Sequence, residues 1–226
     1  MIFGIFEDFT HLASPSPKIK ETLKNSNHIQ KGMKGGIGAN VYEADISNQI
    51  ENPWNKETIL AIISRDRAFR FTIKLNGEDK MSLKNEFCHN IPKGTPYHEF
   101  HKERNANSIV ITIIHAYLIH KIAALNPEME GTLIVCPDAR PKEKVEKYFY
   151  RACRHFGSGI EKRIKVSFRK SCKKDGLLVK APRSMANQTA RRTLRKKLNP
   201  NYSVTKEDIR ELKGFIRSNY QKMKFN

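Results

Sequence analysis

The alternation of apolar and polar residues predicts several strands in the first half of the chain. Phe3–Phe6 are mostly apolar and end at two acids, Glu7 and Asp8, as a short buried strand does. The segment VYEADIS, residues 41–47, favours a second short strand. The run 59–63 and the alternating run 69–75 flank a short turn at 65–67, which is typical of a hairpin. The polar segment between the first two strands, at about 11–40, predicts a long loop.

Helical patterns dominate the second half. A long apolar helix is expected over residues 109–125, and a continuous apolar run at 131–136 predicts a strand buried on both faces. An amphipathic helix follows from about Pro141, then an alternating strand near 163–172 and helices at about 185–198 and 206–223. Residues 78–104 contain Pro92, Gly94 and Pro96 and are expected to be irregular. Helices that alternate with strands favour parallel pairing, whereas the hairpin is antiparallel. The predicted fold is therefore α/β, a mixed β-sheet flanked by helices.

Charge is distributed unevenly along the 226 residues. Residues 1–139 contain 16 Lys and Arg and 16 Asp and Glu, whereas residues 140–226 contain 26 against 7, so the whole net charge of +19 lies in the last part. A solubilising surface has no reason to confine its charge in this way. The asymmetry indicates a polyanionic partner, most often nucleic acid (DNA or RNA).

Cysteine usage and hydropathy favour a cytoplasmic protein without a membrane partner. The four cysteines are widely spaced and form no Cys-x-x-Cys pair, which fits a reducing compartment. The start of the chain lacks the basic region of a signal peptide. The longest apolar stretch is interrupted by His115, His120 and Lys121, so we expect a buried helix rather than a membrane span.

Four short motifs, together with the order of strands and helices, resemble the ribonuclease H-like superfamily. One of them, APRSMANQTARR at 181–192, is similar to the start of the last family helix. The segment FEDFTH at 6–11 is similar to the Asp-Glu-Ser-Gly type motif that ends the first strand in poorly characterised members. The segments LIVCPD at 133–138 and HEFH at 98–101 are similar to the fourth-strand end and to a segment before the long helix. The resemblance implies a ribonuclease H-like α/β domain over about 1–198 and leaves 199–226 as a basic helical extension.

The resemblance also implies a chemistry. Members of this superfamily hydrolyse phosphodiester bonds with two Mg²⁺ ions that are held by several carboxylates. Carried over to this chain, Asp8 and Asp138 would bind Mg²⁺ or Mn²⁺ and Glu99 would assist. The long helix carries no acid, however, and Arg183 or Asn187 occupies the place of an expected aspartate in the last family helix.

These departures leave three hypotheses open. The first, which the strand-end acids favour and which we prefer, is a Mg-dependent nuclease. The second, which the missing acids favour, is a non-catalytic nucleic-acid-binding module of the same fold. The third is an RNA- or ribosome-associated protein of unrelated α/β fold.

All three hypotheses assign nucleic-acid binding to the basic C-terminal third. Residues 191–196 place their cations three to four apart, so that these form one stripe on a helix facing a phosphate backbone. The predicted contact residues are Arg169, Lys170, Lys173, Lys174, Arg183, Arg191, Arg192, Arg195 and Lys196.

Overall fold

A computed structural model of the protein describes residues 40–47, 50, 53–89, 103–136, 142–168, 173–174, 177–178 and 184–223. Every described residue belongs to one compact unit, Ala39–Asn226. The predicted strand Phe3–Phe6 and nearly all of the predicted loop at about 11–40 lie outside the described residues.

A six-stranded mixed sheet organises this unit. Its strands lie in the order β5-β4-β1-β2-β3-β8. β1 pairs antiparallel with β2, and β2 pairs antiparallel with β3, whereas the β1/β4, β4/β5 and β3/β8 pairs are parallel. The expected hairpin and the expected mixed sheet are therefore both confirmed. The strands are β1 (Val41–Ile46), β2 (Thr58–Ser64), β3 (Arg70–Leu75), β4 (Gly131–Val135), β5 (Ile164–Phe168) and β8 (Tyr202–Ser203).

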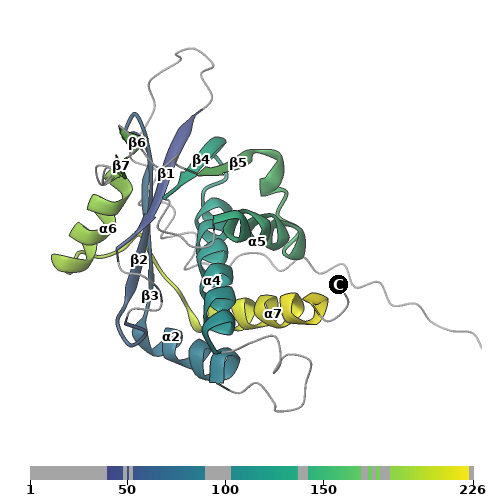
Figure 1. Cartoon of the computed structure of the whole chain (residues 1–226). Coiled ribbons are helices and arrows are strands. Elements are labelled where there is room, and N and C mark those ends of the chain that lie inside the picture. The colour runs from purple at the N-terminus through teal and green to yellow at the C-terminus, as the bar shows by residue number, and fades with distance from the viewer. Residues whose placement is uncertain are drawn as a thin grey trace, which may run out of the picture. The chain divides into compact units, whose positions relative to one another are not determined.

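Helices flank the sheet on both faces. α6 lies against one face, and α4, α5 and α7 lie on the other (Figure 1). Two two-residue strands, β6 (Lys173–Lys174) and β7 (Leu177–Leu178), form a separate small sheet. The helices are α2 (Gly77–Lys84), the π-helical turn η1 (Asn85–His89), α4 (Glu103–Leu125), α5 (Lys142–His155), the 3₁₀ turn η2 (Ile160–Lys162), α6 (Met185–Arg195) and α7 (Lys206–Met223).

β2 is buried on both of its faces, as its apolar sequence requires. Leu60 and Ile62 point into the large core beneath α4, whereas Ile59 and Ala61 contact α6. Successive side chains of a strand point to opposite faces, so one apolar run supports both layers of helices.

α4 is the central helix of the large core. Its segment Ser108–Leu125 is long and apolar enough to cross a membrane, and 72% of that segment is buried within the folded chain. Ile113 and Tyr117 have no exposed surface. α4 packs against α5 and contacts β2, β3 and α7.

The region expected to be irregular, residues 78–104, begins instead with α2 and η1, and α4 starts within it at Glu103. Helical periodicity is hard to detect in α2 because a lysine occupies one of its buried positions. Lys80 has no exposed surface, and its Nζ donates hydrogen bonds to the Pro53 carbonyl (3.2 Å) and to Thr58 Oγ1 (2.9 Å).

The predicted extension at 199–226 includes β8 and α7. β8 pairs with β3, with Tyr202 opposite Ile73. The Asp208 carboxylate in the first turn of α7 accepts hydrogen bonds from Tyr202 Oη (2.7 Å) and the Thr205 amide (2.8 Å), and it forms an ion pair with Lys121 of α4 (2.5 Å). The described part of this segment is thus joined to both the sheet and the core helix.

Candidate nucleic-acid interface

The first turn of α6 is fastened to the carboxyl end of β1. Ser184 is the N-cap residue, and its Oγ accepts a hydrogen bond from the Asn187 amide (3.0 Å). The same hydroxyl donates to Asp45 Oδ2 (2.7 Å), and Asn187 Nδ2 donates to the Ile46 carbonyl (3.1 Å). These bonds fix the start of the helix relative to the strand.

The middle of α6 lies close to β2 because its inward-facing residues are small. Ala186 and Ala190 are buried and pack against Ile59 and Ala61. Alanine side chains allow a helix backbone to approach the sheet closely, and they retain a high helix propensity.

The helix ends three residues earlier than the predicted Leu198. Lys197 adopts a left-handed conformation (φ 48°), and the Leu198 amide donates to the Thr193 carbonyl (3.0 Å), a common way to terminate a helix. In the loop that follows, Asn201 Oδ1 accepts hydrogen bonds from the Thr72 amide (2.8 Å) and Oγ1 (2.9 Å). The far end of α6 is therefore tied to β3.

Asp45 is a buried acid at the end of β1. Its side chain faces α6, only 3% of the residue is exposed, and Oδ1 accepts a hydrogen bond from the Ile46 amide (2.8 Å). Both carboxylate oxygens thus have donors, the second being Ser184. Next to it, the Cys136 amide donates to the Ala44 carbonyl (3.0 Å), which continues the β1/β4 pairing by one residue. A cavity of about 10 Å³ lies here, lined by Glu43, Ala44, Ile134, Cys136 and Ser184.

A buried histidine is electrostatically coupled to this acid. His115 of α4 is almost entirely enclosed, and its Nε2 has no hydrogen-bond partner among the described residues. Burial lowers the pKa of His115 to about 4, although the Asp45 charge acts in the opposite direction. The imidazole is therefore neutral at pH 7.

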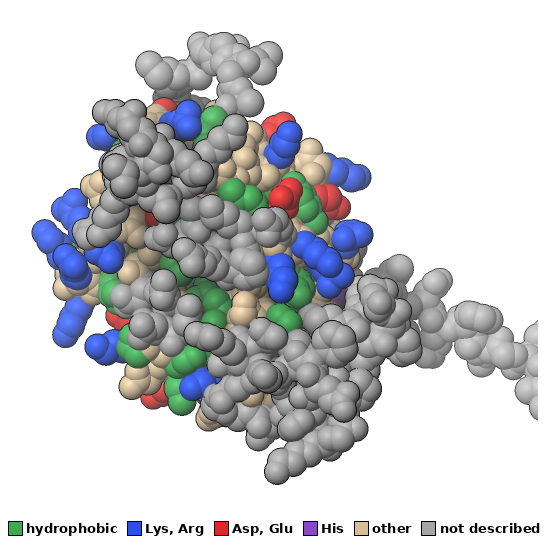
Figure 2. Space-filling model, viewed as in Figure 1, with side chains coloured by type: hydrophobic (Ala, Val, Ile, Leu, Met, Phe, Trp, Pro, Cys, Tyr) green, Lys and Arg blue, Asp and Glu red, His purple; other side chains and the backbone are tan. Residues whose placement is uncertain are grey.

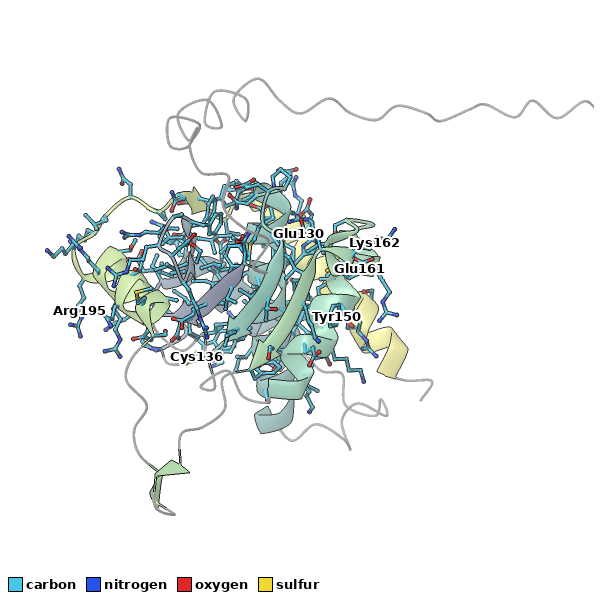
Figure 3. The ribbon with its side chains drawn as sticks, turned by 90° about the horizontal axis from the view of Figure 1, so that it is seen from above. Glu130, Cys136, Tyr150, Glu161, Lys162 and Arg195 are labelled. Carbon is cyan, nitrogen blue, oxygen red and sulfur yellow. The ribbon has the colours of Figure 1, made fainter. Side chains whose placement is uncertain are left out.

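The outer side of α6 is strongly basic. Arg192, Arg195 and Lys196 are exposed, and Arg191 is half-buried. Lys and Arg side chains gather over α6 in the space-filling view (Figure 2). Seen from above, Arg195 extends from α6 on the side of the sheet opposite Tyr150 of α5 (Figure 3).

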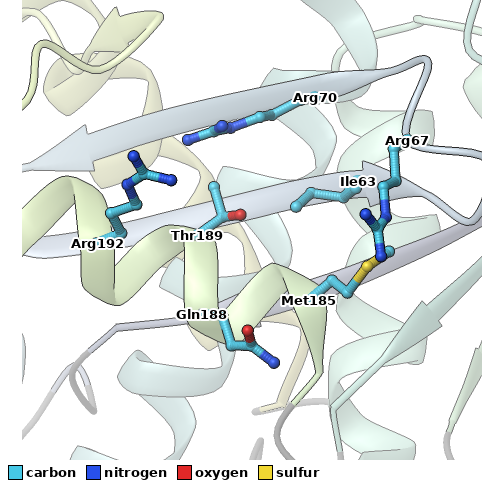
Figure 4. Close-up of a pocket in the computed structure, with 7 residues that line it drawn as sticks. All are labelled: Ile63, Arg67, Arg70, Met185, Gln188, Thr189 and Arg192. Atoms are coloured by element: carbon cyan, nitrogen blue, oxygen red, sulfur yellow. The ribbon is translucent and has the colours of Figure 1, made fainter.

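A pocket of about 460 Å³ lies between α6 and the β2–β3 hairpin. Arg70 and Arg192 point toward one another across it, and Arg67 lies near Met185 closer to the hairpin turn (Figure 4). None of these three arginines forms an ion pair with an acid in the described part of the chain. The lining residues are Ile63, Arg67, Arg70, Met185, Gln188, Thr189 and Arg192.

The hairpin turn sets the position of Arg67. Ser64 Oγ donates a hydrogen bond to Asp66, whose Oδ1 also accepts one from the Ala68 amide (3.0 Å). These bonds lower the pKa of the Asp66 carboxyl. Arg67 adopts a left-handed conformation (φ 65°), which is uncommon for a residue other than glycine.

Half of the twelve residues predicted from the sequence to form the site fall outside the described part of the chain. This applies to Asp8, Glu99, Asp138, Arg169, Lys170 and Arg183, and only the backbone of Lys173 and Lys174, in β6, is described. Within the described ranges, no group of three or more His, Cys, Asp or Glu residues is suited to hold a metal ion. Of the predicted basic contacts, Arg191, Arg192 and Arg195 lie on α6, and Lys196 is its C-cap residue.

Sequence reasoning missed Asp45, Arg67 and Arg70. The alternation of residues 69–75 predicted that Phe71 and Ile73 are apolar positions of a strand. By the same period it made Arg70 and Thr72 polar positions, but it did not identify Arg70 as a site residue. What the sequence does not contain is the packing of α6 over those partners, which brings Arg192 to the hairpin.

Comparisons with models of known protein families, with curated proteins and with solved structures found no match to this chain. The functional argument therefore depends on its own residues.

Proposed function

We propose that this protein binds nucleic acid through α6 and the β2–β3 hairpin. The observation that carries the proposal is the pocket of three arginines, contributed by two elements about 120 residues apart in sequence, without an acidic partner among the described residues. The side chains of Arg67, Arg70 and Arg192 are exposed, so each guanidinium can reach a ligand from solvent. Arginines that lack a carboxylate partner are suited to phosphate, which they bind in bidentate fashion.

The strand order supports a ribonuclease H-like fold as part of this proposal. In that superfamily the first and fourth strands are neighbours, and here β1 pairs with β4 in parallel. Under this proposal β1 takes the place of the family's first strand, and Asp45 takes the strand-end position that the sequence motif assigned to Asp8.

A second candidate function is metal-dependent phosphodiester hydrolysis at the adjoining ends of β1 and β4. It is favoured by the position of Asp45 beside the end of β4, from which Asp138 is two residues beyond Cys136 in sequence. Two residues span at most about 7 Å, so Asp138 is within reach of this strand end.

The described residues alone do not fit a two-metal centre. At this strand end they provide one buried carboxylate, that of Asp45, and both of its oxygens already accept hydrogen bonds. Mg²⁺ requires several free hard oxygen ligands. Binding without hydrolysis is therefore the function that the geometry supports best. Glu99 and Asp138 remain predicted ligands of Mg²⁺ or Mn²⁺, and Asp8 is the alternative to Asp45 at the strand-end position.

One experiment tests both candidates. Labelled single- and double-stranded DNA and RNA are incubated with the full chain, with Mg²⁺, with Mn²⁺ and with chelator, and binding and cleavage are measured in parallel. We expect salt-sensitive binding that Arg70→Gln and Arg192→Gln weaken. Failure to bind any of these ligands at low salt overturns the proposal.

The cleavage arm compares Asp45→Asn, Asp138→Asn and Asp8→Asn with the unsubstituted protein. Metal-dependent cleavage lost in Asp45→Asn and Asp138→Asn, with binding retained, would establish the nuclease. If cleavage is instead lost in Asp8→Asn but not in Asp45→Asn, the strand-end position belongs to Asp8.

A further inference from the structure

Two like charges face one another in the pocket between α6 and β3. The guanidinium groups of Arg70 and Arg192 point toward each other from opposite walls (Figure 4). No described carboxylate forms an ion pair with either, including Glu43, which lies two strands away from Arg70 in the same register. The two positive charges repel each other. An anion bound between them is attracted by both, and at the shorter distance these two attractions outweigh the repulsion.

The surrounding structure fixes the backbone positions from which these two exposed side chains extend. Arg70 is paired with Ile63 across the β2–β3 ladder, and Thr72, two residues further along, is bonded to Asn201. α6 is tied to β1 at Ser184 and packs on β2 through Ala190, two residues before Arg192. Because neither wall needs to be ordered by the ligand, little binding free energy is lost to ordering the backbone.

The charge of the arginine pair matches one kind of phosphate better than another. A phosphodiester inside a nucleic-acid strand has one negative charge, whereas a terminal phosphate monoester has a charge of about −1.5 to −2 at pH 7. Each guanidinium can form a bidentate pair with phosphate oxygens. We propose that the pocket binds the terminal phosphate of a nucleic-acid strand between Arg70 and Arg192, an inference that rests on the proposed nucleic-acid binding.

The rest of the pocket suits the nucleotide attached to that phosphate. Its volume of about 460 Å³ is within the range of roughly 300–1,000 Å³ for small-molecule sites. Ile63 and Met185 provide apolar contacts for a sugar or base. Thr189 lies between these two residues and Arg192, and its hydroxyl is a hydrogen-bonding group in the pocket (Figure 4). Arg67, toward the hairpin turn, is placed to meet the next phosphate of the strand. The ligand class is thus a nucleic-acid strand end that bears a phosphate.

The test measures binding of the full chain to one oligonucleotide sequence in three forms. These have a 5′-phosphate, a 3′-phosphate or hydroxyls at both ends, with the fluorophore attached internally, and affinity is measured by anisotropy. We expect one phosphorylated form to bind about tenfold or more tightly than the dihydroxyl form, because charge-assisted bonds to the added phosphate are strong. Equal affinity for all three forms, with binding retained, overturns this inference and leaves the proposed function intact.

Variants attribute the preference to the pocket. Arg70→Gln and Arg192→Gln are expected to reduce the ratio between phosphorylated and dihydroxyl forms to near one. Arg195→Gln, an exposed position on the same helix outside the pocket, should weaken all three forms alike and preserve the ratio. Thermal melting of each variant confirms that the fold is retained. A ratio that survives in both pocket variants would contradict the assignment.

A competition experiment tests whether the ligand of the pocket is a phosphorylated strand end or a free nucleotide. A nucleoside 5′-monophosphate and inorganic phosphate are titrated against the bound phosphorylated oligonucleotide. If the free nucleotide competes as strongly as the unlabelled phosphorylated oligonucleotide, the site is a mononucleotide pocket and the inference is overturned. If no form of the oligonucleotide binds, the proposed function and this inference both fail.

Discussion

Ser184 connects two structural features with a single hydroxyl group. It caps α6 by accepting from the Asn187 amide and satisfies the enclosed Asp45 carboxylate by donating to it. A buried carboxylate oxygen that loses its donor is left without a hydrogen bond, which costs free energy. The Ser184 hydroxyl therefore contributes to stability in two places, at the helix N-terminus and at Asp45.

Ser184→Ala is expected to lower the free energy of unfolding by about 2 kcal/mol, since it removes both an N-cap bond and a bond to a buried charge. Denaturant unfolding followed by circular dichroism measures this loss. Ser203→Ala, at an exposed position of β8, is the matched control and should change stability by less than about 0.5 kcal/mol. Equal effects of the two substitutions would show that neither the N-cap bond nor the bond to Asp45 contributes to stability.

Two enclosed histidines predict that stability falls in mild acid. Burial lowers the pKa of His115 to about 4, and burial together with the nearby charges of Lys121, Arg163 and His155 lowers the pKa of His120 to about 4. Between about pH 6.5 and pH 4 the unfolded chain takes up protons at these positions and the folded chain does not. Stability is thus retained above pH 6.5 and falls, as pH is lowered, by up to about 1.4 kcal/mol per pH unit for each histidine.

The measurement is the free energy of unfolding by urea at several pH values from 8 to about 4.5. The double variant His115→Gln, His120→Gln should have a shallower dependence on pH over this range, whatever its stability at pH 8. An unchanged slope in the double variant would assign the acid sensitivity to other groups.

At the scale of elements, the arginine pocket depends on how closely α6 lies on the sheet. Ala190 is buried against Ile59 and Ala61, and Arg192 is two residues further along the helix. The distance between α6 and the sheet, and with it the depth of the pocket, thus depends on the buried alanines rather than on the residues that line the pocket.

Ala190→Leu is expected to lower stability by about 1–3 kcal/mol through overpacking and to weaken nucleic-acid binding by displacing Arg192. Ala152→Leu in α5 is the matched control, because it overpacks the core on the other face of the sheet. Both variants should lose stability, but only Ala190→Leu should lose affinity when binding is measured under conditions in which each is fully folded. A similar affinity loss in Ala152→Leu would indicate a general effect of destabilisation.

The elements predicted well from sequence are those with strong local patterns. β2 and β3 follow a clear apolar run and a clear alternation, and α7 spans the predicted range 206–223. α2 was missed because Lys80 is buried through hydrogen bonds to residues 22 and 27 positions away, which no local window contains. The sequence predicted the part of the candidate site on α6 but not the part on the hairpin, again because the contact joins residues far apart in sequence. The basic residues of α6 are local in sequence, whereas their meeting with Arg67 and Arg70 depends on tertiary packing.

On the scale of the whole molecule, the excess positive charge of residues 140–226 predicts that nucleic-acid binding is driven largely by the release of counterions from the phosphates. If about four phosphates are neutralised, the logarithm of the binding constant falls with the logarithm of salt concentration with a slope of about −3.6. Affinity should then decrease on the order of 100-fold between 50 and 200 mM salt. Binding that is insensitive to salt would contradict an electrostatic interface.

The position of the interface is tested by how single substitutions change that slope. Arg192→Gln removes one phosphate contact and should make the slope shallower by about 1, measured by titrating one oligonucleotide at several salt concentrations. Arg210→Gln removes the same formal charge from α7, where the side chain is 73% exposed and paired with Glu207, and should leave the slope unchanged. Since both variants have the same net charge, a difference between them cannot come from the overall field of the protein. Equal changes in the two slopes would mean that the nucleic acid responds to total charge and that α6 is not its docking surface.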